Sequence, residues 1–286
     1  MTQKFTLHTH TWGFDGQNTP AEMIARARQL GFDCIGISNH FIVHPKICHS
    51  KMYKYASASG YASIYSASFS DALQKFEPHY RELTRLQSEN PDIRLLRGLE
   101  VDFFDTPQWH DGFARTYELL RPDYIIGAAH FVEHNGNVCN VHDMASADSK
   151  TRDKMLMQYW ENIRRLAASN IFNWIAHLDL PRKCNLGIEP KWHNIHAQTL
   201  QTIASCGTPI EINTSGYRTI IPQPYPCDSI LKLAAQYNVP VLLSDDAHST
   251  QQIGANFTVA KQFARDCGIQ RFATLNQLLN LHQRGK

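Results

Sequence analysis

The amino-terminal stretch Lys4-Phe5-Thr6-Leu7-His8-Thr9-His10-Thr11 is the part of the sequence that decides the fold. It begins as a short apolar and β-branched run, which is typical of a buried strand, and it ends in two histidines. Side chains two positions apart on an extended segment point to the same side, so His8 and His10 can bind one metal ion together. A strand that ends in potential metal ligands is therefore the pattern to follow through the rest of the chain.

Further runs of the same kind alternate with segments of helical period. The expected strands are Lys4–His8, Asp33–Ser38, Ile93–Val101, Asp123–Ala129, Ile171–His177, Pro209–Asn213 and Val239–Asp245. Short strands that alternate with helices predict a parallel sheet with helical crossovers. The sequence therefore predicts an α/β fold built from seven β/α steps.

The helices between these strands have recognisable ends. The clearest begins at Thr19-Pro20-Ala21-Glu22, which supplies an N-cap hydroxyl, a proline in the first turn and a reciprocal glutamate, and it ends at Gly31. The other expected helices are Phe76–Glu89, Arg152–Ser169, Trp192–Ser205, Cys227–Gln236, Asn256–Asp266 and Leu275–Arg284.

Potential metal ligands stand at or just after the carboxyl end of nearly every expected strand. They are His8 and His10, His40, Glu100, His130, His177, and Asp246 with His248. A single histidine after a strand is usually a loop residue, but the carboxyl ends of parallel barrel strands meet on one face, so this recurrence indicates one shared site. Imidazole and carboxylate ligands suit zinc, iron or manganese, and ions that share ligands are typical of phosphate ester hydrolysis.

Composition excludes several other classes of protein. Of 286 residues, 43% are hydrophobic and 19% are charged, which argues against disorder, and no apolar run is long enough to span a membrane. The net charge of +2 without a basic run gives little support for nucleic-acid binding. Residues 1–7 lack the pattern of a secretory signal, and seven cysteines without a CxxC pair fit a reducing cytosol. We therefore expect a cytoplasmic protein with neither a membrane nor a nucleic acid as partner.

The segment His44–Ser70 departs from this alternation. It is rich in serine, alanine and tyrosine, and we expect it to form a long loop that follows the second strand and its His40. Long loops inside compact domains are often lids or binding elements, although a surface excursion without catalytic effect is an alternative. Because no linker divides the chain, we expect a single domain over residues 1–286 with this excursion at about residues 44–70.

The motifs together resemble the polymerase and histidinol phosphatase (PHP) superfamily. The resemblance rests on His8-Thr9-His10-Thr11 with Asp15-Gly16, Ser38-Asn39-His40, Gly98-Leu99-Glu100, Gly127-Ala128-Ala129-His130, Ala176-His177 and Ser244-Asp245-Asp246-Ala247-His248. Three segments, 98–103, 177–180 and 211–218, are similar to its histidinol-phosphatase branch. The resemblance implies a distorted (β/α)7 barrel that binds three divalent metal ions and converts L-histidinol phosphate to L-histidinol and phosphate in histidine biosynthesis.

The resemblance also implies a ligand set. On the family pattern, His8, His10, Glu100 and Asp246 hold one ion, and Glu100 bridges to a second ion that is held by His130 and His177. Asp15, His40 and His248 hold the third. Two departures, Asn39 where an aspartate is common and the pair Ala128-Ala129 before His130, leave these nine positions intact but affect groups around them.

Two arginines follow strands at the same face. Arg218 lies after the sixth strand and Arg182 lies five residues after His177, with Lys183 beside it. A guanidinium group binds two phosphate oxygens at once, so we expect both arginines to contact the phosphate, although each could also be a surface residue. The group that protonates the leaving alcohol is not identified, and Asp246 or a metal-bound water are candidates. The remaining histidines are expected in loops or on the surface: His44, His49, His79, His110, His134, His142, His193, His196 and His282.

Other functions stay open on the sequence. The same metal site suits another small phosphate ester or a nucleotide as substrate. A PHP module with a structural or nucleic-acid-processing role is a second alternative, against which the near-neutral charge argues. The oligomeric state cannot be predicted.

Overall fold

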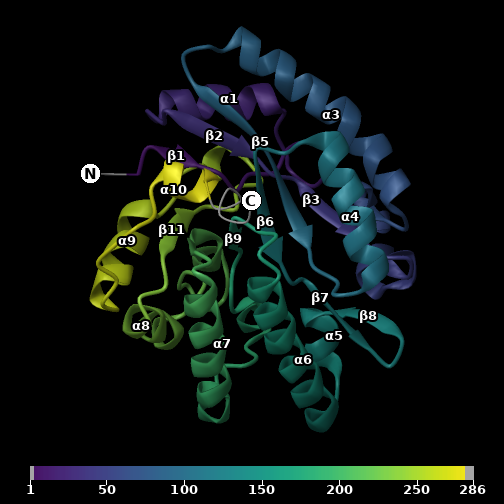
Figure 1. Cartoon of the computed structure of the whole chain (residues 1–286), viewed down its shortest axis with the longest axis vertical. Helices are drawn as coiled ribbons and strands as arrows, with labels where there is room; N and C mark the ends of the chain where they lie inside the picture. The colour runs from purple at the N-terminus through teal and green to yellow at the C-terminus, as the bar shows by residue number, and fades with distance from the viewer. Residues whose placement is uncertain (1–2, 281–286) are drawn as a thin grey trace. The chain divides into compact units, whose positions relative to one another are not determined.

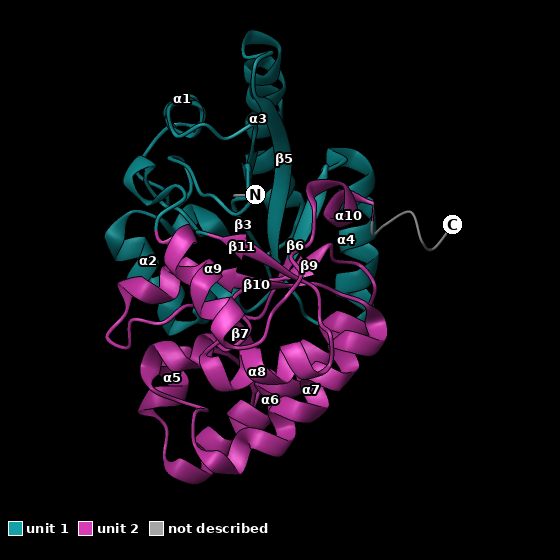
Figure 2. Ribbon diagram, turned by 90° about the vertical axis from the view of Figure 1, so that its left-hand side faces the viewer, with its two compact units in different colours: residues 1–126, 245–255 teal, residues 127–244, 256–286 magenta. Residues whose placement is uncertain are grey.

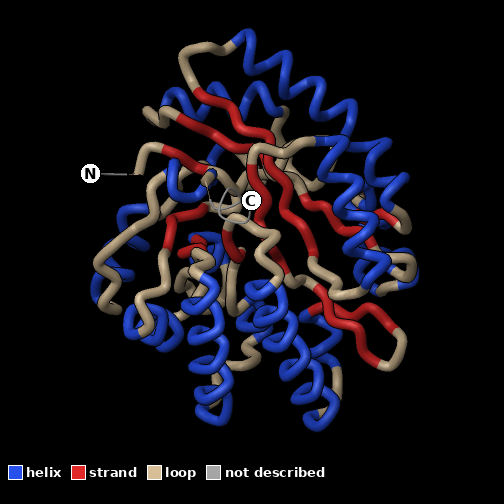
Figure 3. The backbone as a smooth tube through the Cα atoms, viewed as in Figure 1, coloured by secondary structure: helices blue, strands red, loops and turns tan. Residues whose placement is uncertain are grey.

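The computed structural model describes residues 3–280 and has the predicted α/β class (Figures 1 and 3). The strands are β1 (Phe5–Thr6), β2 (Cys34–Ile37), β3 (His40–Val43), β4 (Tyr65–Ser66), β5 (Arg94–Asp102), β6 (Tyr124–Ala128), β7 (Phe131–His134), β8 (Asn137–Asn140), β9 (Trp174–Ile175), β10 (Ile210–Asn213) and β11 (Val241–Ser244). Seven of them follow the order β1-β2-β5-β6-β9-β10-β11, and each lies within a strand predicted above or within one residue of it. The α/β class and this order of seven strands are those of the predicted barrel fold, which confirms the prediction of the fold class.

Helices follow most of these strands. They are α1 (Pro20–Gln29), α2 (Lys51–Ser59), α3 (Phe69–Glu89), α4 (Pro107–Leu120), α5 (Val141–Ser146), α6 (Ser149–Ala168), α7 (His193–Cys206), α8 (Asp228–Gln236), α9 (Phe257–Asp266) and α10 (Leu275–Leu279). Among residues 3–280, none of these helices has both the length and the apolar character that crossing a bilayer requires. The predicted end of the last helix, at Arg284, lies outside the described residues.

The chain divides into two compact units (Figure 2). Unit 1 comprises the residues up to 126 together with 245–255, and unit 2 comprises 127–244 together with the residues from 256 onward. The prediction of one domain over residues 1–286 stays a prediction.

Unit 1 is built on parallel strand pairs around a buried apolar core. Strand β2 pairs with β1 and with β5, and β3 pairs with β5 so that His40 lies opposite Glu100. The predicted capping box is present at α1, where the Thr19 hydroxyl accepts from the Glu22 amide and Glu22 accepts from the Thr19 amide. Side chains of α1, β2 and α3 form the core, including Met23, Ile35 and Leu83.

Tyr124 explains two glycines of unit 1. Its hydroxyl donates a hydrogen bond of 2.5 Å to the carbonyl of Leu7, directly before His8. A Cβ atom at Gly36 would lie 2.1 Å from this hydroxyl, and one at Gly98 would lie 2.2 Å from the ring. The absence of a side chain at Gly36 and Gly98 therefore leaves room for Tyr124, which is hydrogen-bonded to the residue before His8.

Unit 2 contains β10 paired in parallel with β9 and β11, and the antiparallel hairpin β7-β8.

The sequence did not predict several elements of the two units: the hairpin β7-β8, the strands β3 and β4, and the helices α2, α4 and α5. Helix α4 carries the usual start signals, a Thr106 N-cap followed by Pro107, but a glycine within its sequence weakens its helical pattern.

The segment 44–70 is not the long loop that we predicted. It contains α2, whose N-cap Ser50 accepts from the Tyr53 amide and whose C-cap is Gly60, and it ends in β4. Helix α3 begins at Phe69 rather than Phe76, because the Ser68 hydroxyl caps it. Both N-caps are serines. Because the whole segment is rich in serine, we interpreted them as loop residues rather than as the starts of helices.

Candidate metal centre

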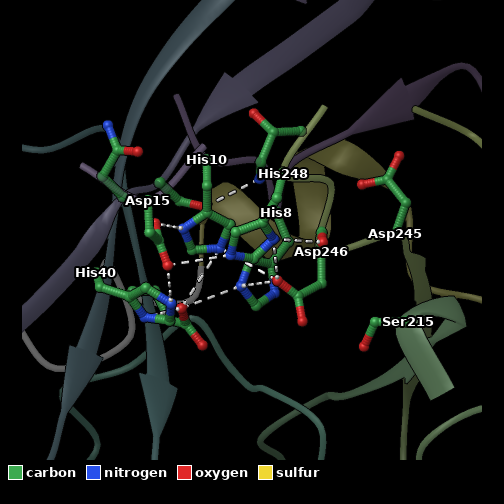
Figure 4. A network of polar contacts seen from close by, with 12 residues as sticks. His8, His10, Asp15, His40, Ser215, Asp245, Asp246 and His248 are labelled. Carbon is green, nitrogen blue, oxygen red and sulfur yellow. Dashed lines mark hydrogen bonds and ion pairs between the residues drawn. The ribbon is translucent and has the colours of Figure 1, made fainter. Parts of the chain in front are cut away.

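Four side chains of unit 1 face one another, and Figure 4 labels three of them, His8, His10 and Asp246. His8 Nε2 lies 3.3 Å from Glu100 Oε2 and 3.7 Å from Asp246 Oδ1. His10 Nε2 lies 3.6 Å and 3.2 Å from the same two oxygens. His8, His10 and Glu100 are completely buried. This is the set that the family pattern assigns to one ion.

The spacing of these atoms suits metal ligands. Hydrogen bonds between nitrogen and oxygen are typically about 2.9 Å long, and most of these distances are longer. Two atoms that each lie about 2.1 Å from one ion are about 3.0–3.4 Å apart in octahedral or tetrahedral geometry. Both ring nitrogens of His10 are buried without making a hydrogen bond, which is costly unless another group satisfies them. The residues therefore fit a divalent cation.

A second group in unit 1 adjoins the first. Asp15 Oδ2 lies 3.2 Å from His40 Nε2 and 3.2 Å from His248 Nε2. The His10 ring stacks on that of His248 at 4.1 Å, and its Nδ1 lies 3.5 Å from Asp15 Oδ1. His40 Nδ1 pairs with Glu100 at 2.6 Å. Asp15, His40 and His248 are the residues expected at the third ion, so seven of the nine predicted ligands lie together in unit 1.

Mutual electrostatics set the charges of this cluster. Burial alone would raise the pKa of Asp15 and of Asp246, but the neighbouring imidazoles outweigh it and hold both values well below the usual range. Burial lowers the pKa of His10, and repulsion from His248 and His40 lowers it further. Burial also opposes a charge on His40, but Glu100 and Asp15 raise its pKa well above the usual value. An ionised Asp246 can bind a metal ion but has no proton to donate to the leaving alcohol, so the role of metal ligand fits it better.

Main-chain contacts bring the two ends of unit 1 together. The amide of His10 donates to the carbonyl of Ala247 at 2.8 Å, and the amide of Ala247 donates to the carbonyl of His8 at 3.1 Å. Asp246 has a φ of 47°, a left-handed conformation that aspartate tolerates better than most residues. This turn at Asp246 directs its carboxylate toward His8 and His10, whereas His248 Nε2 faces Asp15.

The two remaining predicted ligands are neighbours in unit 2. The rings of His130 and His177 lie 4.8 Å apart at an angle of 62°. Beside them is Glu211, a completely buried carboxylate that was not predicted as a site residue. It accepts hydrogen bonds from the Trp174 indole at 2.9 Å, the Asn213 amide at 2.9 Å and the main-chain amide of His177 at 3.4 Å. Glu211 thus holds the backbone of His177.

Arg182 is bound to its own unit. It is 4% exposed, pairs with Asp179 at 3.0 Å and lies over the Tyr225 ring at 4.5 Å. Its guanidinium also donates to the carbonyls of Ile221, Gln223 and Pro224 at 2.7–3.3 Å. Four of its hydrogen-bond contacts are therefore made within unit 2, which gives Arg182 a role in holding the loop after Arg218.

Arg218 is exposed, whereas Arg182 is buried. It ends a short 3-10 turn, Thr214–Arg218, that follows β10 and begins where the Asn213 side chain accepts from the Ser215 amide. Arg218 is exposed, as is Lys183. Of the two predicted phosphate-binding arginines, Arg218 is therefore the more accessible to solvent.

The segment 44–70 lies against the loop that carries Asp15, within unit 1. The Ser63 hydroxyl donates to the carbonyl of Phe14 at 3.5 Å. Lys75 of α3 holds the end of the segment through the carbonyls of Ser63 at 3.0 Å and Tyr65 at 2.7 Å. The segment is therefore anchored next to a predicted ligand, although it is not a loop.

Three histidines that we expected in loops or on the surface are buried. His44, His79 and His196 are 7%, 8% and 5% exposed. His79 and His196 lie on the inner faces of α3 and α7, and His79 follows buried Phe76 by three positions. Helical period was the signal that could have identified them.

Comparisons with known proteins point to one family. The model of the PHP domain matches residues 6–215. A Deinococcus radiodurans protein named "Probable histidinol-phosphatase" is 29% identical over 212 residues, which are 71% of this chain and 77% of that protein. The histidinol-phosphatase of Saccharomyces cerevisiae is 23% identical over 232 residues, 68% of each chain.

A solved structure has a similar fold. The crystal structure of histidinol phosphate phosphatase from Lactococcus lactis, complexed with zinc, L-histidinol and phosphate, superposes with a TM-score of 0.70 at 16% identity. The match covers 96% of this chain and 98% of that one.

Proposed function

The chain belongs to the PHP domain family, and from this membership we propose that it is a metal-dependent phosphate monoesterase that acts on L-histidinol phosphate. The observation that carries the proposal is the group of facing atoms of His8, His10, Glu100 and Asp246 in unit 1. Buried imidazoles and ionised carboxylates at these distances are the ligand set of a hydrolytic metal centre.

The choice of substrate rests on the relatives. Two of them are named as histidinol-phosphatases, and the Lactococcus lactis structure contains both products of such a reaction. The products would be L-histidinol and phosphate, which places the chain in histidine biosynthesis. We also propose a cytoplasmic location, since all seven cysteines are free thiols.

Each predicted ligand has a defined role in the proposal. His8, His10, Glu100 and Asp246 would hold one ion, and Asp15, His40 and His248 would hold another. His130 and His177, with Glu100, stay the predicted ligands of a third. Bound divalent ions, whether zinc, iron or manganese, would supply an activated water and neutralise charge on the phosphoryl group.

The other residues bind and orient. Exposed Arg218 is the group that we propose to contact the phosphate, because its planar guanidinium can donate to two oxygens. Arg182, predicted as a second such contact, would act on the phosphate only through the loop that it holds. Low pKa values of Asp15 and Asp246 keep both carboxylates ionised for metal binding at neutral pH.

Metal analysis and phosphate release test this proposal together. Protein purified without added metal is assayed against L-histidinol phosphate, a nucleoside monophosphate, a sugar phosphate and an aryl phosphate, with Glu100→Ala as the inactive control. We expect bound transition metal and a clear preference for L-histidinol phosphate. Comparable turnover of all four esters would contradict the proposal that L-histidinol phosphate is the substrate. Activity in metal-free protein would contradict the proposal that hydrolysis depends on metal.

A further inference from the structure

His79 is a buried histidine of α3 that is not among the predicted ligands. Its Nε2 atom lies 3.0 Å from Nδ2 of Asn39. Asn39 directly precedes His40 and is 1% exposed, so the contact lies inside the protein. All residues of this contact belong to unit 1.

The hydrogen bonds of Asn39 fix the protonation of His79. The main-chain amide of Thr11 can only donate, and it lies 2.8 Å from Asn39 Oδ1, which identifies that atom as the acceptor. The other end of the side chain, Nδ2, is then the NH2 group, which donates to Thr11 Oγ1 at 3.0 Å and faces His79. Since an NH2 group cannot accept, His79 Nε2 must be unprotonated and the ring neutral, with its proton on Nδ1.

Asn39 in turn joins three segments that carry predicted ligands. Its side chain binds Thr11, the residue after His10. Its carbonyl accepts from the main-chain amide of Glu100 at 3.2 Å, and its own backbone leads into His40. A rotation of the Asn39 side-chain amide would break its hydrogen bonds to Thr11, directly after His10, and a shift of the Asn39 main chain would disturb the segments of His40 and Glu100.

The His79 ring makes a second contact with the same region. It meets the ring of Phe14 edge-on, with centroids 5.1 Å apart. Phe14 precedes Asp15 and also packs on Phe76 of α3 at 4.9 Å. One imidazole thus contacts both Asn39 and the loop that presents Asp15.

We propose that His79 is a positioning residue of the metal centre. Its neutral ring accepts one hydrogen bond from Asn39 and supports Phe14, and through these two residues it orients the segments that bear His10, Asp15, His40 and Glu100. The inference rests on the proposed metal site but not on the identity of the substrate.

The surroundings of His79 suit this role. Burial lowers its pKa to about 4, so the ring stays a hydrogen-bond acceptor throughout the physiological range. A side chain that can only donate, such as lysine, would face the NH2 group of Asn39 with a second donor at this buried position. Neither donor would then have an acceptor, which costs free energy. Imidazole provides an acceptor and an aromatic edge in one side chain.

Two substitutions separate the hydrogen bond from simple packing. His79→Leu fills much of the space but offers no acceptor, whereas His79→Gln places an amide oxygen where Nε2 was. Metal affinity is measured on metal-free protein by competition for Zn²⁺ with a chromophoric chelator, together with the melting temperature. We expect His79→Leu to weaken Zn²⁺ binding by about 10–100-fold, the effect usual for groups that orient ligands, and His79→Gln to restore most of it.

His196 provides a matched control. It is a buried histidine of unit 2, it packs on Trp160 at 4.6 Å, and burial lowers its pKa to about 4 as well. His196→Leu should leave Zn²⁺ affinity within about threefold of the wild type even where it lowers the melting temperature. Equal loss of affinity in His79→Leu and His196→Leu, or none in either, would overturn the proposal.

A spectroscopic measurement tests the hydrogen bond without any substitution. Long-range ¹H–¹⁵N correlation spectra of protein with labelled histidine distinguish the two neutral tautomers. We expect one non-ligand histidine, absent from the spectrum of His79→Gln, to carry its proton on Nδ1 at pH 7. A proton on Nε2 of His79 would contradict the proposal, and because neither experiment uses substrate, a wrong choice of substrate would leave both results readable.

Discussion

Buried charged groups occur in both units, but they are arranged in opposite ways. In unit 1, Asp15, Glu100 and Asp246 face imidazole nitrogens across distances of mostly 3.2–3.7 Å. In unit 2, Arg182 and Glu211 are surrounded by hydrogen-bond partners from within the same unit. Burial of charge by itself therefore does not identify a functional site. The distance between the buried groups is more specific. Groups that are hydrogen-bonded to each other need no further partner, whereas groups at the spacing of metal ligands indicate an ion between them.

The largest expected effect tests the unit 1 side of this comparison. His8→Ala, Glu100→Ala and Asp246→Ala should each lower kcat by more than about a thousandfold, since each removes a ligand of the proposed hydrolytic centre. Phosphate release, metal content and circular dichroism of each variant check this. Full activity after exhaustive chelation, with metal content near zero, would show that the cluster is not a catalytic metal site.

The two arginines test the unit 2 side. Arg182→Ala should lower the free energy of unfolding by about 3–5 kcal/mol, because it leaves buried Asp179 without its ion-pair partner. Arg218→Ala should leave stability unchanged and lower kcat/KM by about tenfold to a thousandfold, the loss of a charge-assisted phosphate contact. Urea unfolding and steady-state kinetics of both variants give the answer. A loss of activity without a loss of stability in Arg182→Ala, together with a loss of stability without a loss of activity in Arg218→Ala, would contradict the roles that we give to these arginines.

The pH dependence of stability compares one buried histidine from each unit. The folded pKa values of His79 and His196, about 4, lie below the unfolded value of 6.5. The unfolded chain therefore takes up protons first as the pH falls, so stability is lost between pH 6.5 and 4 and the loss ends below 4. Each histidine should contribute up to about 1.4 kcal/mol per pH unit across this window.

Replacing either histidine isolates its share. In metal-free protein, His79→Gln and His196→Gln should each flatten the fall in unfolding free energy between pH 6.5 and 5. Urea titrations at several pH values measure the slope. Slopes identical to that of the wild type would mean that the pKa values of these rings are not lowered in the folded state.

The smallest expected effect concerns the segment 44–70. We predict that it selects the organic part of the substrate, because it is anchored through Ser63 beside the loop of Asp15. Replacing residues 51–59 by a short glycine-serine linker should lower kcat/KM for L-histidinol phosphate about tenfold more than for an aryl phosphate. Metal content serves as the control. Equal losses for both esters would place selectivity elsewhere in the chain.

Much of the fold was predictable because its signals are local. The cap at Thr19 and the apolar strand runs depend on neighbouring residues, and they agree with the structure. The pairing of His8 with His10 follows from strand period, and both do face Glu100 and Asp246. Assigning the ligands to individual ions required the pattern of a known family, since the strand pattern alone does not state which of them bind the same ion.

The missed features depend on contacts between distant positions. Arg182 looked like a phosphate ligand because its partners, the carbonyls of residues 221–224, carry no side-chain signal in the sequence. His79 looked like a surface residue because its partner Asn39 is 40 positions away. Helix α2 was obscured by serines and tyrosines that are weak helix formers, and its stability comes from caps and packing.

The return of residues 245–255 to unit 1 has a consequence for biosynthesis. His248 meets Asp15 across 233 positions of sequence, so the first histidines leave the ribosome long before the residues that complete their site. At about 5–20 residues per second, the wait is on the order of ten seconds or more. A metal ion held by both ends could bind its full set of ligands only after residues 246–248 have been made. It would then close a loop that spans 233 positions from Asp15 to His248 and contribute its binding free energy to folding. Metal binding by the whole proposed centre would therefore follow the synthesis of residues 246–248, and a chain released before residue 246 would lack Asp246 and His248.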